Sequence, residues 1–112
     1  MNVCVTLGPE GTVGGGLGKA PRVAVATVTD GQLTAWTEHE VGWDQLHGEG
    51  GEGAHHARMV RFLREHHVEL LVAGHLGGGM QHTLTKLGVR LALGASGDAQ
   101  EAVVAAAAAG RA

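Results

Sequence analysis

Short apolar runs alternate along the chain with glycine-rich polar segments. The runs over residues 2–7 and 22–28 are rich in valine and are each stopped by turn-forming residues, as is typical of buried strands. Asp30-Gly31 follows the second run and precedes a loosely alternating run over residues 33–41. Because Asp-Gly between two strand-like runs is a strong hairpin signal, the first half of the chain predicts three strands, the last two joined in a hairpin.

Helical and strand-like patterns alternate in the second half of the chain. After a loop over residues 42–53, residues 54–67 predict the longest helix, because Ala57, Val60 and Leu63 recur there at helical spacing, with Met59 and Phe62 widening this apolar stripe. The other predicted elements, in chain order, are a buried strand (68–73), a short helix (80–87), a strand (89–93) and an alanine-rich helix (97–109) capped by Ser96 or Asp98. Since an early hairpin followed by βαβ units gives a mixed sheet, we expect a single α/β domain over residues 1–112, with a five-stranded mixed sheet flanked by three helices.

Composition narrows the classes of partner. The chain has 112 residues, is 44% hydrophobic but only 3% aromatic, and carries a formal net charge of −3. Its eight Lys and Arg residues are dispersed, which argues against nucleic acid or an anionic membrane as the main partner, since both reward clustered basic residues. No stretch approaches the roughly 20 apolar residues that span a bilayer, and the N-terminus lacks an export signal. We therefore expect a cytoplasmic protein.

Two glycine-rich segments resemble nucleotide-binding loops, but neither meets all the requirements of such a loop. The first segment is Gly14–Ala20. Val13, directly before it, stands where a phosphate loop needs its first glycine, and Ala20 replaces the Ser or Thr that would hold Mg²⁺. The segment Gly48–Gly53 matches GxGxxG, but its two glutamates would repel a pyrophosphate. Both segments are predicted to be loops, although a helix N-terminus after such a loop can still bind an anion.

Histidine is the other unusual feature, with seven of the eight histidines lying between His47 and His82. His39 falls on the predicted hairpin, and His66 and His67 end the predicted long helix, where imidazolium suits the helix dipole. These three are interpreted as ordinary surface histidines. His55 and His56 differ, because they begin a helix after a glycine loop.

A further histidine lies where α/β sheets bind their ligands. His75 follows a buried strand at its carboxyl end, and Met80 and His82 come shortly after it. Imidazole suits Zn, Cu, Fe and Ni, and thioether favours Cu(I). No HxxxH or CxxC spacing is present, so the metal signal is compositional, and each histidine alone is more often a surface residue than a ligand.

Catalytic patterns are absent. Asp30, Asp44 and Asp98 fall in predicted turns or loops, and no predicted buried strand carries paired carboxylates. There is no Gly-x-Ser-x-Gly elbow, and the single cysteine, Cys4, lies in mid-strand, where a buried and inert thiol is expected. The chain is therefore predicted not to be an enzyme.

The order of several short motifs carries a resemblance to a known family. These motifs are Gly18-Lys19-Ala20-Pro21, the Asp30-Gly31 hairpin, the Gly/His-rich stretch His47–His56, the strand end Val72-Ala73-Gly74-His75-Leu76-Gly77, and Gly88-Val89-Arg90-Leu91. Over nearly its whole length the sequence resembles the dinitrogenase iron–molybdenum cofactor biosynthesis family, of the NifX type or the C-terminal part of NifB-type proteins.

The resemblance implies a ribonuclease-H-like fold and a cargo. Family members bind or carry the iron–molybdenum cofactor, its precursors, or other molybdenum- or copper-containing sulfide clusters. The acidic residues that a nuclease needs are missing here, so nuclease activity is not implied. The sequence departs from the family pattern at Gly16-Leu17-Gly18, where a histidine is lost, and at His75, where one is gained, which suggests a different ligand.

Together these observations predict non-catalytic binding or carriage of a metal or metal–sulfur cluster, containing Fe, Mo or Cu, in a Gly/His-rich crevice. Three segments would form it: Gly14–Lys19, His47–His56 and Gly74–Gly79. The imidazoles of His55, His56 and His75 are expected to converge there, and the alternative is that only one of His55 and His56 faces the crevice, because adjacent residues of a helix point about 100° apart. Its expected partner is a cluster-assembly or acceptor protein. The alternative is a protein–protein interaction module with no metal of its own, and an enzyme on a small anionic substrate is a third. The candidate cofactor-binding residues are Gly16, Gly18, Lys19, Gly74, Gly77 and Gly78, and the candidate metal ligands are His47, His55, His56, His75, Met80 and His82.

Overall fold

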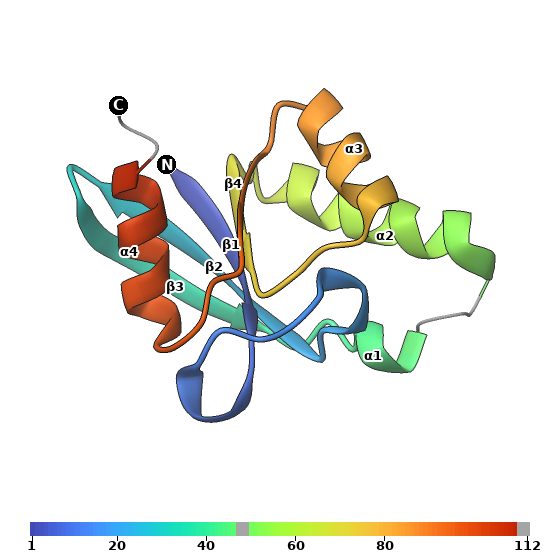
Figure 1. Cartoon of the computed structure of the whole chain (residues 1–112), viewed down its shortest axis with the longest axis horizontal. Helices are drawn as coiled ribbons and strands as arrows, with labels where there is room; N and C mark the ends of the chain where they lie inside the picture. Colours follow the sequence, from blue (N-terminus) through green and yellow to red (C-terminus); the bar gives the residue numbers. More distant parts are fainter. Residues whose placement is uncertain (47–49, 110–112) are drawn as a thin grey trace.

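The computed structural model describes residues 1–46 and 50–109, which form one mixed β-sheet with helices on both faces (Figure 1). The sheet has five strands in the order β3-β2-β1-β4-β5. The β1–β2 and β2–β3 pairs are antiparallel, whereas β1–β4 and β4–β5 are parallel. The predicted five-stranded mixed sheet is confirmed, and its strand order is compatible with a ribonuclease-H-like motif. The strands are β1 (Asn2–Leu7), β2 (Arg22–Thr29), β3 (Gln32–His39), β4 (Leu70–Ala73) and β5 (Arg90–Leu93).

Three helices longer than two turns cover the sheet, as predicted, together with shorter helical turns. In the described residues the α-helices are α1 (Trp43–Leu46), α2 (Gly51–Glu65), α3 (Gly78–Lys86) and α4 (Ala99–Ala109). The glycine-rich segment between β1 and β2 contains two 3₁₀ turns, η1 (Pro9–Gly11) and η2 (Leu17–Lys19). None of the helices in the described ranges has the length and apolar content needed to cross a membrane.

The hairpin is built on the predicted dipeptide. Asp30 and Gly31 have positive φ angles of 52° and 79°, which is the backbone of the two-residue turns that match strand twist. Glycine tolerates this conformation freely, and Asp is one of the few other residues that adopt it readily. The hairpin prediction is confirmed, with the second strand ending at His39 rather than at residue 41.

The sheet separates two apolar cores, because successive side chains of a strand point to opposite faces. On one face Val3, Val5 and Val72 pack against α4 through Val103 and its neighbouring alanines. On the other face a cluster that includes Cys4 and Leu71 of the sheet packs against α2, α3 and η2. Figure 1 shows α4 on the side of the sheet opposite to α2 and α3.

Two predictions about the connection into α2 are wrong. Residues 42–53 are not all loop, because α1 forms from Trp43, whose buried ring packs edge-on against Phe62 at a centroid distance of 5.4 Å. The predicted helix 54–67 begins earlier, at Gly51. Its buried side includes Met59 and Leu63, whereas Ala57 is exposed, so the predicted stripe is rotated toward the His55 side of the helix.

Candidate functional site

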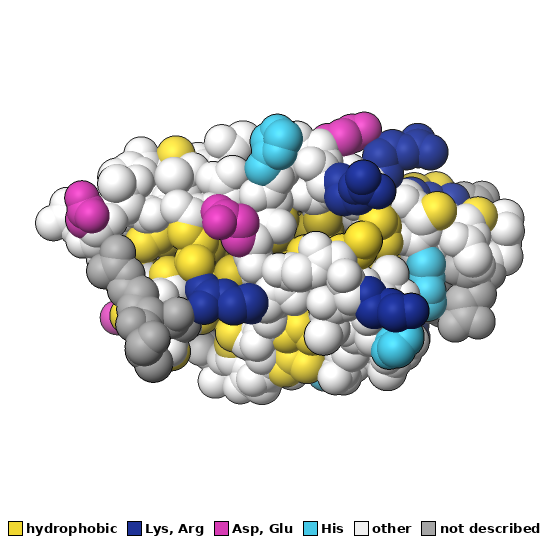
Figure 2. All heavy atoms as spheres, turned by 90° about the horizontal axis from the view of Figure 1, so that it is seen from above, with side chains coloured by type: hydrophobic (Ala, Val, Ile, Leu, Met, Phe, Trp, Pro, Cys, Tyr) yellow, Lys and Arg dark blue, Asp and Glu magenta, His cyan; other side chains and the backbone are white. Residues whose placement is uncertain are grey.

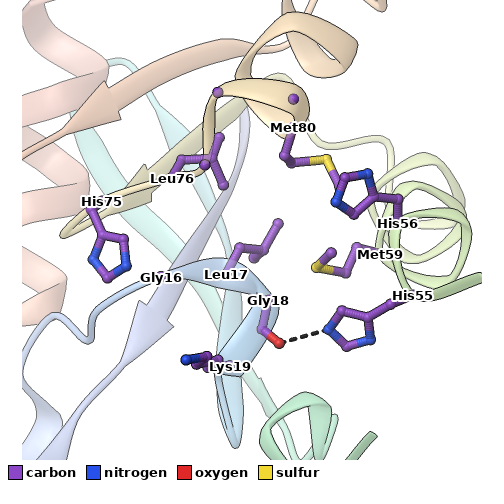
Figure 3. A pocket seen from close by; sticks show the side chains of 13 residues that line it. Gly16, Leu17, Gly18, Lys19, His55, His56, Met59, His75, Leu76 and Met80 are labelled. Carbon is purple, nitrogen blue, oxygen red and sulfur yellow. Dashed lines mark hydrogen bonds between the residues drawn. The ribbon is translucent and has the colours of Figure 1, made fainter. Parts of the chain in front are cut away.

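A cavity of about 580 Å³ lies between η2, the first turns of α2 and the start of α3 (Figure 3). Residues from the three segments expected to form a crevice line it, including Gly16, Gly18 and Lys19 of the glycine-rich loop. The described residues that line the cavity are Gly16, Leu17, Gly18, Lys19, His55, His56, Met59, His75, Leu76, Gly77, Gly78, Gly79 and Met80.

The glycine-rich loop is fixed against the ends of the two central strands. The Gly14 amide donates to the carbonyl of Thr6, at 2.8 Å, and the Gly74 amide donates to the carbonyl of Gly14, at 3.1 Å. A Cβ atom added at Gly74 would lie 2.7 Å from the Gly14 oxygen, so only glycine permits this approach. Gly74 therefore holds the loop in place, and it does not line the cavity.

His55 connects helix α2 to the loop. Its side chain is only 4% exposed, and its Nε2 atom lies 2.6 Å from the carbonyl oxygen of Gly18. Its Nδ1 atom lies 2.6 Å from Nη1 of Arg58, which also donates to the carbonyl of Leu46 at 3.2 Å. With both ring nitrogens in hydrogen bonds, His55 forms a wall of the cavity and could bind a metal only by giving one of them up.

His56 and two methionines line another part of the cavity. Met59 follows His56 by three residues on α2, and Met80 lies in the first turn of α3. Figure 3 shows the Met80 sulfur turned toward the His56 ring and the Met59 side chain between the rings of His55 and His56. Met59 was absent from the predicted site, although its spacing of three residues from His56 places the two side chains on the same side of a helix.

His75 lies against the loop and apart from the other two histidines. It is exposed, and Gly16 pairs with it in an isolated parallel bridge. A Cβ atom at Gly16 would lie 2.7 Å from its Nε2 atom, so glycine leaves the space that this ring occupies. In Figure 3 the ring lies beside Gly16, away from His55 and His56.

The expected convergence of three imidazoles at His55, His56 and His75 is wrong. Within residues 1–46 and 50–109, no three His, Cys, Asp or Glu side chains are close enough to hold a metal ion together. The Gly74–Gly14 hydrogen bond draws His75 toward the loop, while His55 and His56 point in different directions because adjacent helical residues diverge by about 100°.

The remaining candidates are divided between the cavity and other parts of the molecule. His82 is exposed on α3 and does not line the cavity, and His47 lies outside the described residues. His39 packs against Phe62 and His66, with ring centroids 5.3 and 4.8 Å apart. Met80 and the glycines of the α3 N-terminus, Gly77 and Gly78, line the cavity.

The charge around the cavity favours anions. None of the described residues lining it is acidic, and Lys19 is exposed at its edge. The N-terminus of α3 opens onto it, and the N-cap residue, Gly77, makes no side-chain capping hydrogen bond. Elsewhere, Lys and Arg side chains are spread over the face in Figure 2, with acidic side chains among them.

The single thiol is unsuited to hold a metal in this state. Cys4 is fully buried on β1, and burial raises the pKa of its thiol from about 9 to about 12. Since the thiolate is the form that binds metals, the soft donors among the described lining residues are the thioethers of Met59 and Met80.

The site and fold are accompanied by a family match over almost the entire chain. The family described as "Dinitrogenase iron-molybdenum cofactor" matches residues 1–110. The chain belongs to this family. The resemblance drawn from the sequence is thereby confirmed.

Two solved structures are similar to this member of the family. PH0822, known from a crystal structure, is 16% identical with a TM-score of 0.74, and the match covers 98% of this chain and 92% of that one. TM1290, a proposed NifB protein from Thermotoga assigned to the DUF35 family and solved by NMR, is 22% identical with a TM-score of 0.64, covering 96% and 87%. At these identities the likeness shows the fold alone. No curated protein matches the chain.

Proposed function

We propose that this chain carries an anionic metal–sulfur cluster, containing Fe, Mo or Cu, as cargo in the cavity between η2, α2 and α3, and that it does so without catalysing a reaction. The observation that carries the proposal is the α3 N-terminus, which opens with no side-chain cap onto a cavity that has a lysine and, among its described lining, no acid. Family membership supports the class of cargo.

The electrostatic argument rests on the first turn of α3. The first amide N–H groups of a helix have no partner within the helix, and the helix dipole places partial positive charge there. Gly77, Gly78 and Gly79 line the cavity with no side chain to cover these amides. Sulfide ligands of a cluster carry negative charge and accept hydrogen bonds, so amides here and the Lys19 ammonium would stabilise a bound cluster.

The size and openness of the cavity suit a carrier. A volume of about 580 Å³ is within the range of small-molecule sites, roughly 300–1,000 Å³. Lys19, His75 and Gly77–Gly79 are exposed at its rim, which supports transfer of the cargo to a cluster-assembly or acceptor protein.

A pair of substitutions at Gly78 tests the proposal. Gly78 is the first residue of α3, where proline is well tolerated, and the preceding Gly77 has φ −62° and ψ 150°, a conformation allowed before proline. A Cβ atom at Gly78 meets nothing within 4 Å. Gly78→Pro therefore removes one N–H from the cavity wall, whereas Gly78→Ala retains it.

The measurement is an anaerobic titration with tetrathiomolybdate, followed by calorimetry and visible absorption. Wild type and Gly78→Ala should bind alike, while Gly78→Pro and Lys19→Gln should bind about tenfold more weakly or worse, because hydrogen bonds to charged groups contribute about 1.5–3 kcal/mol. Absence of binding by the wild type, or equal affinity in all four proteins, would contradict a cluster site here.

A further inference from the structure

The two methionines that line the cavity are almost fully buried. Met59 and Met80 are 2% and 3% exposed, yet both line the cavity. They are two of the three methionines in the whole chain. Methionine often fills irregular gaps in apolar cores, so burial alone does not distinguish a packing role from a binding role. The distinction comes from the imidazole between them.

His56 brings a nitrogen donor to the two sulfur atoms. His56 and Met59 share a side of α2, and a Cβ atom at Gly79, next to Met80, would lie 3.7 Å from Cε1 of His56. The Met80 sulfur is turned toward this ring in Figure 3. Among the described hydrogen bonds His56 has none, whereas both ring nitrogens of His55 are engaged. Of the two helix α2 imidazoles in the cavity, His56 is therefore the one beside the methionines whose ring nitrogens are not engaged in a described hydrogen bond.

We propose that His56, Met59 and Met80 form a three-coordinate site that binds Cu(I) directly, without any sulfide cluster. Thioethers select Cu(I) among the biological first-row metals, and imidazole is also a copper ligand. This inference concerns the same cavity as the proposed function but does not depend on it, since the Cu(I) ion would be held by side chains of the protein and not within a sulfide cluster.

The donor set disfavours the other common metals. Mg²⁺, Ca²⁺ and Mn²⁺ prefer carboxylate, carbonyl and water oxygens, and no acidic side chain occurs in the described lining. Zn²⁺ prefers four ligands drawn from thiolate, imidazole and carboxylate, and no group of three such side chains exists in the described part of the chain. Two thioethers and one imidazole satisfy Cu(I) alone among these ions.

The test is an anaerobic competition of the protein with bicinchoninate for Cu(I), on untagged protein, with Zn²⁺ as a competitor. The wild type should bind one Cu(I) per chain, and Zn²⁺ should not displace it. Met59→Leu/Met80→Leu keeps the apolar volume at small cost to stability, and His56→Ala removes the nitrogen. Each should weaken Cu(I) binding by more than about tenfold, a loss already common when only a hydrogen-bond partner of a metal ligand is changed.

Two matched controls isolate the site. His82→Ala removes an exposed histidine of α3 that lies outside the cavity, and Cys4→Ala removes the only thiol; both should bind Cu(I) as the wild type does. Copper X-ray absorption should show sulfur and nitrogen neighbours of the metal in both the wild type and Cys4→Ala. An all-oxygen/nitrogen shell, or equal affinity after the methionine substitutions, would overturn the proposal.

Tetrathiomolybdate titration of the same proteins separates this inference from the proposed function. If the wild type binds thiomolybdate but not Cu(I), the copper site fails and the cluster site stands. If it binds Cu(I) through the methionines but not thiomolybdate, the copper site stands and cluster carriage fails. Failure with both ligands overturns both.

Discussion

The Nε2 atom of His55 lies 2.6 Å from the carbonyl oxygen of Gly18, while Nδ1 of the same ring lies 2.6 Å from the Arg58 guanidinium. A guanidinium only donates hydrogen bonds, so Nδ1 must accept. The proton is therefore on Nε2, which donates to Gly18, and the ring is neutral. A single imidazole thus joins the glycine-rich loop to helix α2 and, through Arg58, to the carbonyl of Leu46 at the end of α1.

Removing this imidazole should destabilise the fold. His55→Ala leaves the Gly18 carbonyl without this donor and Arg58 without this acceptor, and it empties a buried site. We expect the free energy of unfolding in urea to fall by about 2–3 kcal/mol. His82→Ala, at an exposed position on the neighbouring helix α3, should change it by less than about 0.5 kcal/mol. Similar values for the two variants would show that the His55 contacts contribute little.

The Cys4 thiol should make stability fall at high pH. Because burial raises the pKa of this thiol from about 9 to about 12, the unfolded chain loses the proton first as pH rises. Above pH 9 the folded state binds one more proton than the unfolded state, so unfolding becomes easier by up to roughly 1.4 kcal/mol per pH unit until the folded thiol also titrates.

The comparison with Cys4→Ala isolates this effect. Urea unfolding of both proteins at pH 8, 9, 10 and 11 gives the difference in free energy, in which the lysines cancel, and the chain contains no tyrosine. The difference should be constant up to about pH 9 and then shift against the wild type. A difference that stays constant to pH 11 would show that the thiol titrates normally in the folded protein.

Gly74 should not tolerate a side chain. In Gly74→Ala the new Cβ atom would lie 2.7 Å from the backbone oxygen of Gly14, and neither backbone can move without breaking the pairing between loop and strand. We expect a loss of about 2 kcal/mol or more in unfolding free energy. Gly53→Ala is the control, because a Cβ atom there meets nothing within 4 Å in helix α2, and it should stabilise the protein by about 0.5 kcal/mol.

Asp98, rather than Ser96, should cap helix α4. Its Oδ2 atom accepts a hydrogen bond from the Glu101 amide at 2.9 Å, whereas the exposed Ser96 lies further from the helix start. Asp98→Ala should lower the unfolding free energy by about 1 kcal/mol, and Ser96→Ala by less than about 0.5 kcal/mol. Thermal or urea unfolding of the two variants decides between these caps, which the sequence leaves open.

Local chemistry was enough to predict most of the fold. The Asp30-Gly31 turn, the valine-rich strands and the alanine-rich last helix each carry a pattern that tertiary packing reinforces. Helix α1 was not predictable in this way, because four residues are too few to show a period. Its formation depends on Trp43, which is held by the Ala20 carbonyl and by Phe62, both distant in sequence.

The site was less accessible to prediction because it depends on side-chain direction. The sequence places His55, His56 and His75 near one edge of the sheet, but only the pairing of Gly74 with Gly14 and of His75 with Gly16 turns the last ring away from the others. The high number of histidines favours imidazole as the predicted metal ligand. The apolar stripe predicts Met59 to be a core residue, although its helical spacing from His56 places it on the same side of the helix.

Because the sheet separates the two cores, helix α4 is a suitable place to attach a label. Its exposed Gln100 lies on the face opposite to the cavity-lining helices, so a fluorophore attached through Gln100→Cys would leave the cavity open. The native thiol, buried and with its pKa raised to about 12, would not compete for the label. The protein could then be immobilised or monitored by fluorescence while metal uptake proceeds on the other side of the sheet.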